Sequence, residues 1–253
     1  MSGLIRVEWK KIFLPVLFTT ILLSIVMSVL SCTLYRNYSL HYDLEAWEVG
    51  TEFLSLLFPL FTVVPLCWNL YYEGKDNFLL YVMPRVPIKS YLMAKWLAYA
   101  AGSFCIMTIP CVLSAVCALY INEPVLSTIT TAFSHVFQSA FTQSPLLYVA
   151  ALSFWRGFIG ILVMTFGFTL ALYCKNVFVV LTGPFMYAIL ENFILAICHL
   201  EAYRLVVAFD PTSISSDAVS AVSFIAGPVL LLLVISMTAF FFGKIKRHTI
   251  VSA

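Results

Sequence analysis

The chain has 253 residues, of which 62% are hydrophobic and only 10% are charged, and its formal net charge is +2. A typical soluble domain has about 25% charged residues, so this composition excludes an ordinary soluble protein and is typical of an integral membrane protein. The apolar runs are continuous and about 20 residues long, which predicts transmembrane α-helices, because the strands of a barrel would alternate apolar and polar residues.

Residues 1–11 precede the first apolar run, and the sequence LIRVEWKKIF, residues 4–13, extends from them into the start of that run. Its apolar residues fall on one half of a helical wheel and its basic residues on the other, and Glu8 is the exception. This pattern predicts an interfacial amphipathic helix that leads into the first span. A short basic lead-in that only orients the span is the alternative.

Six apolar runs predict an all-α membrane protein with six transmembrane helices in a single domain, residues 1–253. The runs cover about residues 12–34, 50–71, 91–121, 148–174, 177–200 and 220–243. Of the 14 Lys and Arg residues, 11 lie before the first run, between the second run and the start of the third, at Lys175 or after the last run. The positive-inside rule therefore predicts that both termini and residues 72–90 are cytoplasmic.

Residues 72–90 form a charged segment that also contains large apolar side chains. Acidic residues near its start and Pro84 and Pro87 near its end favour a short cytoplasmic helix. Apolar side chains on a cytoplasmic segment need to be covered by protein or by lipid. An apolar centre with a charged rim is typical of a docking contact, and a membrane-surface helix without a partner is the alternative.

Residues 122–147 form the longest predicted outer loop, and apolar side chains recur there at every fourth position. They are Val125, Ile129, Phe133, Phe137 and Phe141. This spacing predicts an amphipathic helix that lies on the outer membrane surface or covers the ends of the spans. A lid over an exit path is the functional alternative.

Two charged residues, Arg156 and Glu191, fall inside the fourth and fifth apolar runs. Counting from the outer ends of those runs places them at a similar depth, roughly 12–14 Å below the boundary. Charges at such a depth are expected to pair or to face water. We therefore predict that they form an interhelical ion pair or line a translocation path.

No motif for catalysis, metal binding or phosphate binding is found, so no catalytic, cofactor or metal site is expected on this chain. The seven cysteines lie mostly in apolar runs without CxxC spacing, which favours buried thiols over a metal or disulfide site. The basic cytoplasmic face suits anionic lipids and gives no reason to expect nucleic acid.

The sequence resembles the permease subunit of ABC-2 type transporters. The resemblance is carried by the RVEWKK lead-in, the six spans, and the series Glu73-Gly74-Lys75, Pro87, Lys89 and Lys95. It implies that residues 72–90 are a coupling helix that binds a separate ATP-binding cassette subunit, which carries ATP and Mg²⁺. The residues assigned to ATPase coupling in this way are Glu73, Gly74, Lys75, Phe78, Leu79, Arg85, Pro87 and Lys89.

The small size is similar to that of bacterial lantibiotic-immunity and phenol-soluble modulin exporters. This similarity implies a multi-pass protein of the bacterial cell membrane that exports bacteriocin-type or modulin-type peptides, together with a second permease copy. Alternatives are an ABC-2 exporter of drugs or lipids, and a membrane sensor or scaffold without transport. An intramembrane enzyme is disfavoured by the absence of a paired catalytic set.

Overall fold

The computed structural model describes residues 2–33, 40, 42–76, 78, 82, 84, 86–121, 135–215 and 218–250. Within these residues the regular structure is entirely helical. Six helices are long and apolar enough to cross a membrane. The prediction of an all-helical, multi-pass membrane protein is therefore confirmed at this level.

These six helices are α1 (Ser2–Thr33), α3 (Leu54–Lys75), α5 (Ile88–Tyr120), α7 (Pro145–Tyr173), α8 (Val177–Ile197) and α10 (Ala221–Ile250). The shorter helices are α2 (Asp43–Thr51), α6 (Gln138–Gln143), α9 (Leu205–Phe209) and the 3₁₀ turns η2 (Glu201–Tyr203) and η3 (Pro211–Ser213). Helix α1 is unbroken from Ser2, so the predicted N-terminal helix of residues 1–11 is not a separate element. Its position at a membrane surface stays a prediction.

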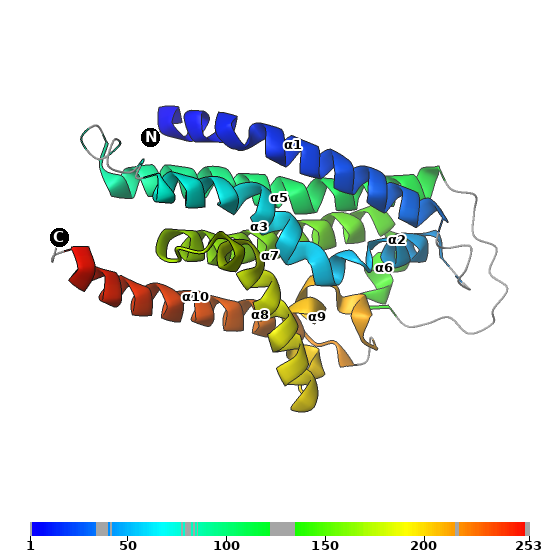
Figure 1. Cartoon of the computed structure of the whole chain (residues 1–253). Helices are drawn as coiled ribbons and strands as arrows, with labels where there is room; N and C mark the ends of the chain where they lie inside the picture. Colours follow the sequence, from blue (N-terminus) through cyan, green and yellow to red (C-terminus); the bar gives the residue numbers. More distant parts are fainter. Residues whose placement is uncertain are drawn as a thin grey trace.

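Both chain termini and the connection between α3 and α5 lie at one end of the bundle, and α2 and α6 lie at the opposite end (Figure 1). We call these the inner and the outer end, following the distribution of basic residues. Helix α5 has 33 residues and is about 50 Å long at 1.5 Å per residue. It therefore exceeds a hydrocarbon core of about 30 Å.

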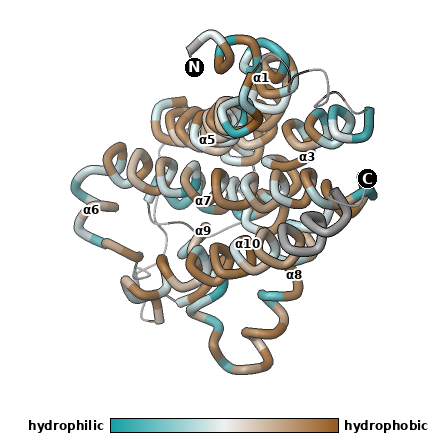
Figure 2. The backbone as a smooth tube through the Cα atoms, turned by 90° about the vertical axis from the view of Figure 1, so that its left-hand side faces the viewer, coloured by the Kyte–Doolittle hydropathy of each residue, from teal (hydrophilic) through white to brown (hydrophobic). Residues whose placement is uncertain are grey.

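Helix α7 is central, with α5 on one side and α10 on the other (Figure 2). Its glycines allow this packing: a Cβ atom at Gly160 would lie 2.9 Å from Met107 of α5, and one at Gly167 would lie 2.7 Å from Val63 of α3. These small residues of α7 thus form the surface on which α3 and α5 pack closely.

Between α8 and α10 the chain folds back into the bundle through η2, α9 and η3, which we call the re-entrant segment, residues 201–213 (Figure 1). Leu205, Ala208 and Phe209 are fully buried, and the Phe209 ring stacks on Phe58 of α3 with the ring centroids 4.2 Å apart. Irregular backbone is tolerated at membrane depth where protein surrounds it.

The predicted outer amphipathic helix of residues 122–147 is only partly described, because residues 122–134 lie outside the described part of the chain. In the remainder, the helix α6 begins after Phe137, which has a left-handed backbone conformation with φ of 57°. Phe137 is 65% exposed whereas Phe141 is buried. The expectation that both share one face of a continuous helix is therefore wrong, because the backbone turns at Phe137.

Candidate functional site

Four charged side chains meet at the inner ends of α1, α3 and α5. The Lys95 ammonium lies against a carboxylate oxygen of Glu73 and 3.2 Å from Glu8, and Lys11 is 2.7 Å from Glu8 and 3.1 Å from Glu73. Tyr91 donates a hydrogen bond of 2.9 Å to Glu73. We call Glu8, Lys11, Glu73 and Lys95 the inner charge network, and its two positive and two negative charges balance.

This network explains residues that the sequence presented separately. Lys95 is fully buried and Glu8 is only 2% exposed. Glu8 disturbs the basic face of the N-terminal wheel because it pairs with the lysine of another helix. Buried charges require such partners, since their desolvation is costly. Spacing within one helix carried no signal for a pair that joins residues 8 and 95.

The structure separates the predicted coupling residues into two groups. Glu73 belongs to the inner charge network, and the ring of Phe78 lies 5.2 Å from the Lys11 ammonium. The second group is exposed around the start and end of the connection, and consists of Gly74, Lys75, Pro87 and Lys89. Leu79 and Arg85 lie outside the described residues.

A groove runs between α1 and α3 and starts beside the inner charge network. Its inner part has a volume of about 420 Å³. Its lining there is partly polar and consists of Lys11, Ile12, Pro15, Pro65, Trp68, Asn69, Glu73 and Phe78. Lysine, asparagine and glutamate side chains thus face the same space as an aromatic ring.

The groove continues toward the outer end as a second hollow of about 510 Å³, which shares Pro15, Pro65 and Trp68 with the first. The other residues that line it are apolar apart from one threonine, and they are Phe18, Thr19, Leu22, Leu60, Phe61, Val64 and Leu181 of α8. We call the two hollows together the α1–α3 groove. It is partly polar at the inner end and apolar farther along, which matches an amphipathic ligand.

The predicted ion pair between Arg156 and Glu191 does not form. Arg156 is fully buried and its guanidinium lies 3.1 Å from Asp210, while its Nε atom donates to the carbonyl of Phe209 at 3.2 Å. A further hydrogen bond of 3.3 Å reaches Thr51. The partner of this charge is therefore in the re-entrant segment and not in α8.

Glu191 accepts the backbone N–H of Leu205 with both carboxylate oxygens, at 3.0 and 3.1 Å. The two charges thus lie at opposite ends of α9: the carboxylate at its N-terminus and Arg156 at its C-terminus. Each complements the partial charge of that helix end. Counting residues from the outer ends of the apolar runs placed Arg156 and Glu191 at a similar depth. That count could not show that the short helix α9 lies between them.

At the outer end, His135 lies between two carboxylates of α2, and we call these three residues the outer clamp. Its Nε2 atom is 2.8 Å from Glu45 and its Nδ1 atom is 3.4 Å from Glu48. Burial lowers the pKa of His135, but the hydrogen bonds and charges of both glutamates outweigh this effect and raise the pKa to about 9. The imidazole is therefore a cation at neutral pH.

Among the described residues, no group of three His, Cys, Asp or Glu side chains is arranged to hold a metal ion.

Comparisons of the chain with protein-family models, with curated proteins and with solved structures found no match. The class that fold and sequence together define is a multi-pass helical membrane protein, and its assignment to a transporter family stays a prediction.

Proposed function

We propose that this chain is the permease subunit of an ABC-2 type exporter, which moves amphipathic peptides out of a bacterial cell. ATP and Mg²⁺ would bind a separate ATPase subunit, which docks on residues 72–90. The observation that supports this proposal most directly is the α1–α3 groove, because it begins beside Glu73 and Phe78, where the proposed coupling segment starts.

The groove has the chemistry that an amphipathic peptide requires. Its apolar part, with Phe61 and Val64, suits the apolar face of a helical peptide. At the inner end Asn69 can accept or donate hydrogen bonds, and Lys11 can donate them. Trp68 lies where the two parts meet and is 47% exposed. Such an aromatic side chain can contact both apolar and polar parts of a ligand.

The inner charge network supplies a route from the coupling segment to the groove. Glu73 stands at the end of α3 and contacts Lys11 of α1 and Lys95 of α5. Breaking a buried ion pair is costly. A displacement of residues 72–90 by the ATPase would therefore shift the inner ends of α1, α3 and α5 as one unit. In the proposed mechanism this movement changes the width of the groove.

A second copy of the chain would complete the path. Both α1 and α8 present large exposed apolar side chains beside the groove, among them Phe18, Leu22 and Phe178. In a dimer these faces would enclose the groove of each copy, and the remaining apolar surface would contact lipid. The exposed apolar faces are compatible with both contacts.

The test is to isolate the chain with the ATPase that co-purifies with it and to measure ATP turnover in proteoliposomes with an amphipathic helical peptide. We expect peptide-stimulated turnover to fall severalfold in Leu22→Trp, because the larger side chain fills the groove. Ile25→Trp is the matched control, since Ile25 is exposed on α1 but does not line the groove. Absence of a co-purifying ATPase would contradict the proposal, and stimulation by lipids alone would favour a lipid exporter.

A further inference from the structure

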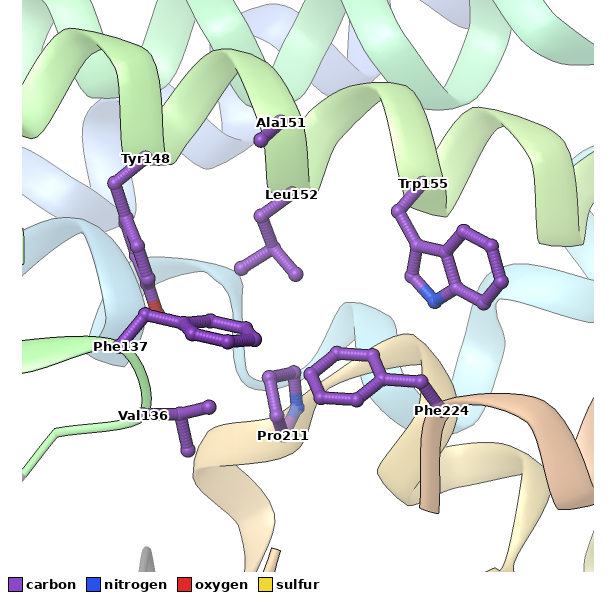
Figure 3. A pocket seen from close by; sticks show the side chains of 8 residues that line it. All are labelled: Val136, Phe137, Tyr148, Ala151, Leu152, Trp155, Pro211 and Phe224. Carbon is purple, nitrogen blue, oxygen red and sulfur yellow. The ribbon is translucent and has the colours of Figure 1, made fainter. Parts of the chain in front are cut away.

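A separate hollow lies at the outer end of the bundle, away from the α1–α3 groove. It has a volume of about 160 Å³ and is bordered by α7, by the residues before α6, by η3 and by the first turn of α10 (Figure 3). We call it the outer pocket. Its lining consists of Val136, Phe137, Tyr148, Ala151, Leu152, Trp155, Pro211 and Phe224.

Aromatic rings form most of the wall of the outer pocket. Figure 3 shows Tyr148 and Phe137 on one side and Trp155 and Phe224 on the other, with Leu152 pointing between them from α7. The ring centroids of Phe137 and Phe224 are 5.9 Å apart, and those of Trp155 and Phe224 are 6.3 Å apart. Separations of this size are those of rings in contact, so Phe224 connects Phe137 and Trp155 into one aromatic wall.

The polar side-chain atoms of the lining are already engaged elsewhere. The indole N–H of Trp155 donates to the carbonyl of Ala208 at 2.9 Å, and the Tyr148 hydroxyl donates to Glu48 at 3.2 Å. The other lining side chains are entirely apolar. A buried water needs two to four polar partners, so this pocket offers poor binding to water and good binding to an apolar ligand.

Phe137, which forms part of the wall of the outer pocket, has an unfavourable backbone conformation. A left-handed backbone is unfavourable for a bulky L-residue, and Phe137 adopts it with φ of 57°. Two residues earlier, His135 is fixed by Glu45 and Glu48 and stacks on Phe141 with centroids 4.0 Å apart. The outer clamp therefore anchors the chain two residues before Phe137, which limits the movement of this part of the wall.

We propose that the outer pocket is a binding site for a small, free aromatic compound with a single ring and no polar substituent. The size agrees, because an enclosed apolar cavity of about 150 Å³ binds benzene. The outer pocket has a similar volume and lining, and it is open on the side of the exposed residues Phe137 and Ala151. A phenolic hydroxyl or an indole N–H would lose its hydrogen bonds to water and find no partner. The site thus selects against polar aromatic compounds of equal size.

The test uses the purified full chain in detergent, with fluorobenzene as the probe and ¹⁹F NMR and thermal unfolding as readouts. We expect a saturable shift of the fluorine resonance and a rise in Tm with fluorobenzene, and an apparent affinity at least about tenfold weaker for phenol. Ala151→Phe should abolish both effects, because its ring occupies the pocket. Ala150→Phe is the matched control, since Ala150 is exposed on the same helix and does not line the pocket.

A signal that does not saturate, or that is equal in both variants, would show partition into the micelle and overturn the site. If Ala151→Phe does not fold, Leu152→Ala decides, because the enlarged pocket should prefer naphthalene to fluorobenzene, and an unchanged preference counts against the proposal. Competition by N-acetyl-phenylalanine amide would identify a peptide side chain as the occupant and overturn the assignment to a free compound. These outcomes do not depend on an ATPase, so they are independent of the proposed transport function.

Discussion

Arg156 illustrates how much a single buried charge depends on side chains from several elements. Its guanidinium contacts Asp210 and lies between the rings of Trp47 and Phe209, at 5.0 and 5.3 Å from their centroids. Arginine suits this position because its planar, weakly hydrated group can stack and donate several hydrogen bonds at once. A lysine could provide the charge but not the planar contacts.

This environment leads to a double-mutant prediction. Arg156→Met leaves the Asp210 carboxylate buried without its partner, and loss of one member of such a pair costs about 3–5 kcal/mol in soluble proteins. Arg156→Met with Asp210→Asn should lose less stability than the sum of the single variants, by about 0.5–3 kcal/mol. Thermal unfolding of the purified variants measures this coupling. The same cycle with Glu191→Gln in place of Asp210→Asn is the comparison. A coupling energy that is larger for Arg156 with Glu191 than for Arg156 with Asp210 would contradict the pairing seen in the structure.

At the level of elements, different polar contacts hold the helices together at the inner end and at the outer end of the bundle. The inner charge network connects α1, α3 and α5, whereas at the outer end the outer clamp joins α2 to the residue that leads toward α6. Helix α9 is held at both ends, by Glu191 and by Arg156. Five residues cannot form a stable isolated helix, so the re-entrant segment depends on the spans around it.

The inner charge network predicts a large difference between two lysines of α5. Lys95→Met should destabilise the protein by about 3–5 kcal/mol, because Glu8 and Glu73 would then share only Lys11. Lys89→Met is the matched control and should change stability by less than about 0.5 kcal/mol, since Lys89 is exposed. Unfolding midpoints of the two variants in the same detergent test this difference. Equal midpoints would mean that the network is not formed in the folded protein.

For the whole molecule, the orientation in the membrane decides which surfaces meet the cytoplasm. The termini and the α3–α5 connection share one end (Figure 1), and the basic residues predict that this end is cytoplasmic. The coupling assignment requires that orientation, whereas the outer pocket requires only that the fold is correct.

Labelling of single cysteines in intact cells, in a background without the native cysteines, tests the orientation. An impermeant reagent should label Gln143→Cys and leave Lys89→Cys unlabelled until the cells are opened. Both positions are exposed; Gln143 ends α6 at the outer end, and Lys89 lies in the first turn of α5 at the inner end. The reverse pattern would refute both the orientation and the docking of an ATPase on residues 72–90.

Length and hydropathy were sufficient to predict six helices that are long and apolar enough to cross a membrane. For most of these helix ends, the observed and the predicted residue differ by only a few positions. The largest difference is at α1, which continues through residues 2–11. These features are local, because a long apolar run must form a helix in lipid whichever partner it meets.

The contacts that build the sites were decided only by the tertiary structure. Glu8 meets Lys95, His135 meets Glu45 and Glu48, and Arg156 meets Asp210 instead of Glu191. Each pair joins residues far apart in the chain, and none has a spacing that periodicity could detect. The sequence by itself determined that Arg156 and Glu191 lie deep in apolar runs and need partners. The packing of the helices and the return of residues 201–213 into the bundle decided which groups those partners are, and that Glu8 and Lys95 are buried as well. The reason is that a buried charge pairs with whatever the fold brings within hydrogen-bonding distance.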